Sequence, residues 1–421
     1  MSSKDEIEDV VDDDAAGSTA GPIIRDPSEL DLSRTTLTAS PNPPDPDDSK
    51  TKADRIRSFA TEIIGDENLE RLLENKPQVV AYDGFEPSGR MHIAQGLIRA
   101  INTNKLTESG CHFKFWVADW FATMNLKMGG DAKMIRKAGE LMIHTWRACG
   151  MNMDNVEFIW ASEEIAARPV EYWGLVLDIA TKNSVKRILK CGQIMGRKEF
   201  DDDGNATDIS MDDVVRDLQA SQVFYPVMQC ADIFFLGVDI CSLGLDQRKV
   251  NTLAIEYCDK IKRRFKPIIV SHAMLMGLDG SDKMSKSNPD SAIFMDDTEQ
   301  EVNRKIKRAF CEPQNIEKNP ILEYFKYIVF PMEEQKREKV QVQRLEFETK
   351  LKTTVIYESH DDLVRDFAEG YIFPNDLKDT LKMYLKIYID PVRQYFADNP
   401  EAGGLSTEVK KYTARMNAHK K

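Results

Sequence analysis

The fold is decided by QVVAYDGFEPSGRMHIAQ, residues 78–95. The apolar run at its start has the composition of a buried strand, and a helical pattern begins near His92, so the turn lies where a strand passes into a helix. A helix start presents free backbone N–H groups and a partial positive charge, which suit a bound phosphate. The stretch therefore predicts an α/β fold with an anion site at the turn, although by itself an ordinary glycine turn is the simpler interpretation.

A second segment, Lys283-Met284-Ser285-Lys286-Ser287, follows roughly 190 residues later. Its two lysines come directly after residues 277–282, whose glycines and small polar side chains suit a loop that can close over a polyphosphate. Two solvated lysines are the simpler interpretation of this segment alone. Together and in this order, the two segments predict a split site for the phosphates of ATP.

The composition favours an intracellular protein with two folded units. The chain has 421 residues, of which 42% are hydrophobic, enough for a sizeable core in each unit. Its seven cysteines, an odd number, predict reduced thiols, and its six scattered histidines predict no metal site. No apolar run reaches the ~18 residues that cross a bilayer, and the acidic N-terminus does not fit a signal or transit peptide. We therefore expect a cytoplasmic protein without a membrane segment.

Acidic charge is concentrated in residues 1–52. They carry thirteen Asp and Glu against five Lys and Arg, whereas the net charge of the whole chain is −13. This segment is rich in proline at residues 41–46 and lacks aromatic residues, which is typical of a disordered tail. The remainder is nearly balanced. The net charge argues against indiscriminate binding to nucleic acid, although such binding follows local patches rather than the total charge.

From residue 53 to about 300, apolar runs alternate with amphipathic segments, the pattern of a parallel sheet covered by helices. The expected strands are residues 79–82, 113–118, 156–160, 238–243 and 267–270, and the main helices between them are 93–106, 132–149 and 246–264. Residues 168–215 have the composition of an insertion between the two halves of the sheet. Strand patterns stop after about residue 300, so residues 301–421 are expected to be helical.

Two segments combine polar side chains with apolar surroundings. On the expected helix 223–235, Tyr225, Gln229 and Asp232 share one face; they meet either a polar ligand or one another in a core network. After the strand 238–243, Gly244 allows close approach of a ligand, and Asp246 is placed to accept hydrogen bonds from ribose hydroxyls. A helix cap followed by two solvated basic residues is the simpler interpretation of this second segment alone.

In their order along the chain, these four segments resemble those of class I aminoacyl-tRNA synthetases, most closely the eukaryotic cytoplasmic tyrosyl-tRNA synthetases. The resemblance covers residues 53–421. The resemblance implies a Rossmann-like catalytic domain at residues 53–300, with the insertion 168–215 used for homodimer contact, and a helical anticodon-binding domain at residues 301–421. It also implies that tyrosine reacts with ATP, carried as its Mg²⁺ complex, and is then transferred to tRNA(Tyr).

For the amino acid, the resemblance implies that Tyr82 and Asp232 bond the phenol hydroxyl and that Tyr225, Gln229 and Gln247 hold the ammonium group. Groups buried to bind a hydroxyl are left unpaired by phenylalanine, which is therefore rejected.

The resemblance further implies an ATP site formed by Gly84, His92, Gln95, Gly244, Asp246, Lys283 and Lys286. Here His92 and Gln95 would contact the phosphates, Gly244 and Asp246 the ribose, and the two lysines the departing pyrophosphate. The family's HIGH tetrapeptide reads His92-Ile93-Ala94-Gln95 in this chain, so Gln95 offers only a neutral donor. Because the tyrosine carboxylate itself attacks phosphorus, catalysis would come from positioning and positive charge.

For tRNA, the resemblance implies that Arg248 and Lys249 face the acceptor end and that Asp376 reads the first anticodon base. A helix cap is the simpler interpretation of Asp376. Two alternatives remain: a tryptophanyl-tRNA synthetase, which residues 288–293 resemble, and a catalytically silent RNA-binding relative. Tyr82 and Gln229 favour tyrosine over tryptophan, and the two lysines of the second segment argue against a silent protein.

Overall fold

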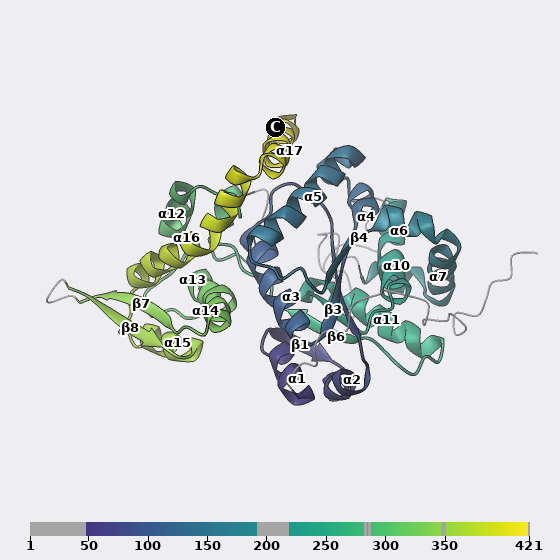
Figure 1. Cartoon of the computed structure of the whole chain (residues 1–421), viewed down its shortest axis with the longest axis horizontal. Coiled ribbons are helices and arrows are strands. Elements are labelled where there is room, and N and C mark those ends of the chain that lie inside the picture. Colours follow the sequence, from purple (N-terminus) through teal and green to yellow (C-terminus); the bar gives the residue numbers. More distant parts are fainter. Residues whose placement is uncertain (1–47, 192–218, 282–283, 285–287, 347–350, 420–421) are drawn as a thin grey trace, which may run out of the picture. The chain divides into compact units, whose positions relative to one another are not determined.

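A six-stranded sheet forms the centre of the structure, a computed structural model that describes residues 48–191, 219–281, 284, 288–346 and 351–419 (Figure 1). The strand order is β1-β6-β5-β2-β3-β4. Only β1 runs antiparallel to its neighbour; the other pairs are parallel. The strands are β1 (Ala60–Ile64), β2 (Val79–Phe85), β3 (Cys111–Val117), β4 (Val156–Trp160), β5 (Ile240–Gly244) and β6 (Ile268–His272).

All five expected strands are confirmed, with ends shifted by up to three residues. The edge strand β1 was not predicted, because it is only five residues long and none of its residues is buried. The expected tail also ends earlier than residue 52. Helix α1 (Ser49–Arg57) begins at Ser49, because the carboxylate of Asp48 accepts the backbone N–H of Thr51 and caps the helix.

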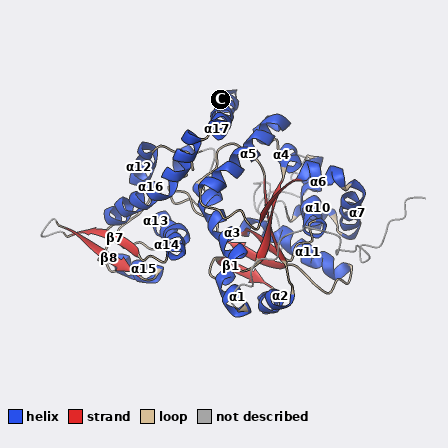
Figure 2. Cartoon of the chain, in the orientation of Figure 1, coloured by secondary structure: helices blue, strands red, loops and turns tan. Residues whose placement is uncertain are grey.

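Helices cover both faces of the sheet (Figure 2). On one face lie α3 (Arg99–Glu108) and α5 (Ala132–Ala148), and on the other lie α7 (Pro169–Lys182), α10 (Ala220–Phe235) and α11 (Arg248–Lys260). Successive side chains of β2 point to opposite faces of the sheet. Ala81 therefore packs on the face covered by α3 and α5, and Tyr82 on the face covered by α7, α10 and α11. The remaining helices of this half are α2 (Leu69–Asn75), α4 (Asp119–Met124), α6 (Ala161–Ala167) and α8 (Val185–Leu189).

The C-terminal part is mainly helical: α12 (Glu299–Arg308), α13 (Pro320–Tyr324), α14 (Phe330–Lys336), α15 (His360–Ala368), α16 (Pro374–Asp398) and α17 (Pro400–His419). The expectation that strands stop after residue 300 is wrong, because β7 (Val340–Leu345) and β8 (Lys352–Tyr357) form an antiparallel pair. Val340 and Val342 are buried against α16, whose Tyr384 and Thr380 hydroxyls accept N–H groups of β7. Packing on α16 thus stabilises a pair of strands that would be marginal alone.

Within the described residues, no helix combines the length and the apolar character needed to span a membrane.

Candidate functional site

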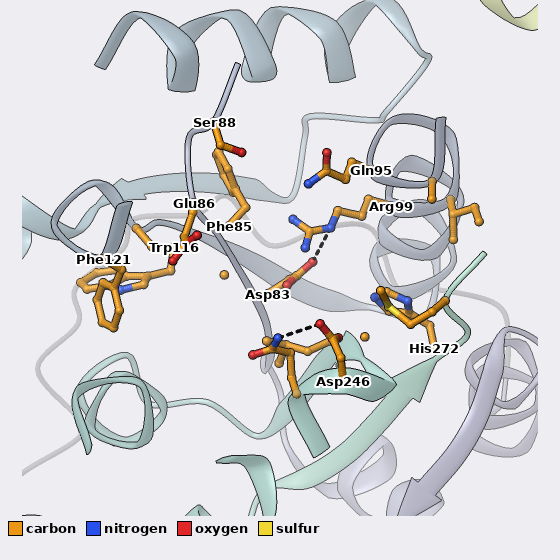
Figure 3. Close-up of a pocket in the computed structure, with 18 of the residues that line it drawn as sticks. Asp83, Phe85, Glu86, Ser88, Gln95, Arg99, Trp116, Phe121, Asp246 and His272 are labelled. Carbon is orange, nitrogen blue, oxygen red and sulfur yellow. Dashed lines mark hydrogen bonds and ion pairs between the residues drawn. The ribbon is translucent and has the colours of Figure 1, made fainter. Parts of the chain in front are cut away.

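A cavity of about 360 Å³ opens beside the carboxyl ends of β2 and β5 (Figure 3). The chain runs from β2 to β3 on one side of the sheet and returns to pair β5 with β2 on the other, which makes this edge a topological switch point. Ligands bind at such points in open α/β sheets. The cavity brings together predicted residues from three segments: Tyr82, Gly84, His92, Gln95, Tyr225, Gln229, Asp232, Gly244, Asp246 and Gln247.

Figure 3 shows an aromatic side of the cavity, with Trp116 and Phe121, and a polar side, with Gln95, Arg99 and His272. The aromatic side can hold a ring, and the polar side offers charge and hydrogen bonds.

Tyr82 and Asp232 are each 1% exposed at the aromatic side. The hydroxyl of Tyr172 donates to Oδ1 of Asp232 at 2.8 Å. Oδ2 accepts no hydrogen bond of good geometry from the described residues, although the indole N–H of Trp116 lies near enough to lower the pKa of the carboxyl. Burial raises the pKa of Asp232 well above its ordinary value. It also raises the pKa of Tyr82, so this hydroxyl stays protonated as a donor.

Gly84 makes room for the hydroxyl of Tyr82. A Cβ at this position would lie 3.1 Å from that oxygen. A larger residue would therefore displace the hydroxyl, which explains a glycine two residues after Tyr82 in β2.

Polar side chains join α10 to the turn after β5. The amide of Gln229 donates to Oε1 of Gln247 at 3.0 Å, and Gln247 donates to Asp246 at 3.1 Å. The Oε1 atom of Gln229 lacks a partner among the described residues. Burial and the nearby carboxylate of Glu86, another residue of the cavity wall, raise the pKa of the Tyr225 hydroxyl. This corner combines a carboxylate with unpaired amide oxygen, which suits an ammonium group.

His272 and the pair Asp83–Arg99 form the polar side. Nε of Arg99 lies 3.1 Å from Oδ2 of Asp83, and burial raises the pKa of Asp83 to about 6. Burial lowers the pKa of His272 to about 4, so its ring is neutral at pH 7. A Cβ on Gly244 would lie 2.6 Å from Oδ1 of Asp246, so the backbone here stays open to a ligand.

The helix start after the glycine turn is tied to the chain that follows the lysine segment. Ile93 N–H donates to Ile293 C=O at 2.8 Å, and a Cβ on Gly96 would lie 2.6 Å from Met295. Lys283 and Lys286 lie outside the described residues. Met284, between them, is described and lines the cavity.

Three predicted residues do not line the cavity. Nε of Arg248 lies 2.7 Å from Glu62, and the C=O of Lys249 accepts from Arg187 at 3.2 Å. Asp376 is buried at the start of α16, where its two oxygens accept the N–H groups of Leu345 and Phe373, each at 3.0 Å. The capping interpretation of Asp376 therefore holds, whatever else this side chain binds.

Sequence reasoning missed Tyr172, Glu86, Arg99 and His272, and assigned no role to Asp83. Tyr172 lies in an apolar helical pattern that indicates only a core position. Glu86, Arg99 and His272 reach the site through contacts between segments distant in sequence. The one available signal was Asp83, a charged residue within an otherwise apolar strand.

The cavity wall holds a concentration of buried polar atoms that lack hydrogen-bond partners among the described residues. They are Asp83 Oδ1, Gln95 Oε1, Arg99 Nη1, Trp116 Nε1, Gln229 Oε1, Asp232 Oδ2 and His272 Nε2. Unpaired buried polar atoms are costly in folded proteins. Their gathering in one cavity indicates a site built for a polar ligand.

Comparison with known proteins agrees with this geometry. Residues 74–388 match the family model described as tRNA synthetases class I (W and Y). The chain is 51% identical over 358 residues to "Tyrosine--tRNA ligase 1, cytoplasmic" of Arabidopsis thaliana, covering 85% of this chain and 87% of that one. It is 33% identical to the "Tyrosine--tRNA ligase" of Thermococcus kodakarensis, in a match that covers 86% of this chain and 99% of that one.

Among solved structures, the chain resembles Leishmania major tyrosyl-tRNA synthetase in complex with tyrosinol, with a TM-score of 0.76 and 44% identity. The match covers 87% of this chain but only 61% of the Leishmania chain. Plasmodium falciparum tryptophanyl-tRNA synthetase, at 16% identity and a TM-score of 0.58, shares the fold alone.

Proposed function

The chain belongs to the class I tRNA synthetases of the tryptophan and tyrosine family and is a tyrosine–tRNA ligase, and we propose that the cavity at β2 and β5 is where it activates tyrosine. Class I synthetases use ATP. The tyrosine carboxylate would attack the α-phosphorus of ATP and release pyrophosphate, and the tyrosyl group would then pass from the adenylate to tRNA(Tyr).

The observation that carries the proposal is the pairing of a buried hydroxyl with a buried, half-satisfied carboxylate. Tyr82 can donate to a phenol oxygen, while Oδ2 of Asp232, without a partner among the described residues, can accept a hydrogen bond from the phenol hydroxyl. An indole N–H could bond to Asp232 but has no acceptor for Tyr82. This chemistry favours tyrosine over tryptophan.

At the other end of the amino acid, Tyr225, Gln229 and Gln247 would hold the ammonium group. The carboxylate of Glu86 adds negative charge beside Tyr225. With both ends held, the substrate carboxylate would point toward the polar side of the cavity.

For ATP, we propose that Gly84, Gly244 and Asp246 bind the nucleoside and that His92 and Gln95 contact phosphates. The backbone N–H of Gln95 lies 3.4 Å from Nδ1 of His92, so Nδ1 acts as the acceptor and Nε2 carries the proton that can reach a phosphate oxygen. Mg²⁺ would enter on the ATP phosphates and Lys283 and Lys286 would neutralise the pyrophosphate, so catalysis rests on positioning and charge.

The test is tyrosine-dependent exchange of pyrophosphate into ATP, run with a panel of amino acids. Tyrosine alone should support exchange; exchange with tryptophan instead would replace the substrate, and no exchange with any amino acid would leave only the RNA-binding alternative. Lys286→Ala should slow adenylate formation while changing tyrosine affinity little. Equal losses in both would remove Lys286 from its proposed role.

For tRNA, we propose that Arg248 and Lys249 lie near the acceptor end and that residues 301–421 bind the anticodon. Tyr371 and Phe373 are 43% and 46% exposed close to Asp376 in sequence, and exposed rings of this kind stack on unpaired bases.

We further propose a cytoplasmic homodimer. Val170, Trp173 and Leu177 share one face of α7 and are 85%, 39% and 63% exposed. A second copy covering this apolar face would bury it. Sedimentation of the wild type and of Leu177→Glu tests this, with a monomeric variant expected.

A further inference from the structure

The turn after α4 has an unusual backbone. Leu126 and Met128 have φ of 51° and 48°, and Gly129 and Gly130 continue at 68° and 79°. Side chains other than glycine rarely adopt this left-handed region, so neighbouring structure has to hold the turn in place.

This turn carries Lys127 to the wall of the cavity. Nζ of Lys127 lies 3.1 Å from Oε2 of Glu86, and the amide of Asn125 donates to the other oxygen. The same carboxylate shares the cavity wall with Tyr225 and helps to raise the pKa of its hydroxyl, after burial. The shape of the turn therefore fixes a carboxylate and a hydroxyl at the proposed ammonium site.

The C-terminal helix α17 holds the turn. The hydroxyl of Tyr412 shares its proton between the C=O of Met128 at 3.1 Å and Oδ2 of Asp131, which caps α5, at 3.4 Å. Met128 is buried in a small apolar cluster that includes Val409, and Met416 approaches to 3.6 Å of a Cβ placed on Gly129. These contacts come from outside the family match, which ends at residue 388.

A second contact of α17 reaches the segment before His92. Nζ of Lys410 lies 2.8 Å from Asp296, which also pairs with Arg90 at 2.6 Å. Helix α17 thus contacts the turn that carries Lys127 and, through Asp296, the segment that contains Arg90.

We propose that Tyr412 is a positioning residue for amino-acid binding, acting through Met128 and Lys127 on Glu86 and Tyr225. The inference rests on the proposed function, because it assigns Tyr225 to the substrate ammonium group. The hydroxyl of Tyr412 touches no atom of the reaction; it keeps a strained turn in the one shape that places Lys127 on Glu86.

The experiment compares Tyr412→Phe with Tyr395→Phe. Tyr395 is the matched control, because its hydroxyl also joins the C-terminal helices to α5, bonding to His144 at 2.8 Å, but does not touch the turn. Tyrosine affinity is measured by equilibrium binding without ATP, and KM for tyrosine and for ATP by pyrophosphate exchange, normalised to the titrated active-site fraction. Tyr412→Phe should raise Kd and KM for tyrosine about three- to tenfold, the loss of one hydrogen bond, with KM for ATP unchanged. Tyr395→Phe should match the wild type.

A double-mutant comparison separates positioning from folding. Lys127→Met should weaken tyrosine binding, and adding Tyr412→Phe to it should cause little further loss, because both act through Glu86. Unchanged tyrosine affinity in Tyr412→Phe, a loss confined to the active fraction, or additive losses in the double variant would each overturn the inference. Failure of the wild type to activate tyrosine would instead count against the proposed function.

Discussion

Tyr172 donates a hydrogen bond of 2.8 Å to Oδ1 of Asp232, and the other oxygen of that carboxylate is left without a partner among the described residues. The two residues come from α7 and α10 and are both buried. Tyr172 thus fixes the carboxylate so that Oδ2 remains for the substrate. Rigid support of this kind is what lets a site distinguish a hydroxyl from its absence.

Tyr172→Phe should weaken tyrosine binding. It leaves Oδ1 buried and unsatisfied, at a cost of about 1–3 kcal/mol, and frees the carboxylate to turn away from the substrate. We expect a rise in KM for tyrosine of about tenfold and a smaller preference for tyrosine over phenylalanine in pyrophosphate exchange. Tyr257→Phe is the control, because that hydroxyl bonds to Asp178 away from the cavity. Similar effects in both variants would contradict the role of Tyr172.

Gly84→Ala should damage the site with little effect on the fold. The new Cβ would lie 3.1 Å from the hydroxyl of Tyr82, and it has to push that donor away from the phenol position. KM for tyrosine should rise while the melting temperature changes little. Gly404→Ala on α17 provides the control, since a Cβ there meets nothing within 4 Å; it should keep wild-type kinetics and stabilise the helix by up to ~1 kcal/mol.

Asp83 should make stability depend on pH. Burial raises its pKa from 3.8 to about 6 although Arg99 opposes the shift, and Asp246 adds to it. The folded state therefore keeps this proton over a range where the unfolded chain has lost it, so the free energy of unfolding falls as pH rises from 3.8 to about 6 and is level above. Burial lowers the pKa of His272 from 6.5 to about 4, so its contribution to the free energy of unfolding rises as pH rises between these values. It therefore opposes the contribution of Asp83 over much of the range.

Asp83→Asn isolates the first contribution, because it leaves His272 in place. Melting temperatures of wild type and variant, measured from about pH 4 to about pH 7, should show the wild type losing stability relative to the variant as pH rises. A constant difference across this range would mean that the carboxylate ionises normally in the folded protein.

The sheet could be read from the sequence because its strands are buried runs with sharp ends. Strand β5 ends at Gly244 and β2 ends one residue after Gly84, and both glycines line the cavity. The pair β7 and β8 was missed although Val340 and Val342 alternate with Gln341 and Gln343, which is the pattern of a half-buried strand. What the pattern does not show is the attachment of β7 to hydroxyls of α16. Such support is invisible to local periodicity.

Site residues could be predicted where a polar side chain occurs within an apolar segment. Gln229 and Asp232 are polar residues in an apolar helix, and the cavity does gather them with Tyr82. Tyr172 and Lys127 could not be found, since their roles come from contacts with Asp232 and Glu86 that local patterns do not reveal.

Asp376 should combine a structural and a recognition role, and the two can be separated by Asp376→Asn. Both of its oxygens already accept backbone N–H groups, of Leu345 and Phe373, but each oxygen has a second lone pair that a base could use. The variant keeps the size of the side chain but replaces one accepting oxygen with an NH2 group, so one of the two backbone N–H groups loses its acceptor. We therefore expect stability to fall by about 1–3 kcal/mol. Pyrophosphate exchange should be unchanged and charging of tRNA reduced, mostly through KM for tRNA. Asp379→Asn, which alters an exposed partner of Lys382 one turn along the same helix, should leave charging intact. Normal charging by Asp376→Asn at wild-type KM would reduce Asp376 to a helix cap.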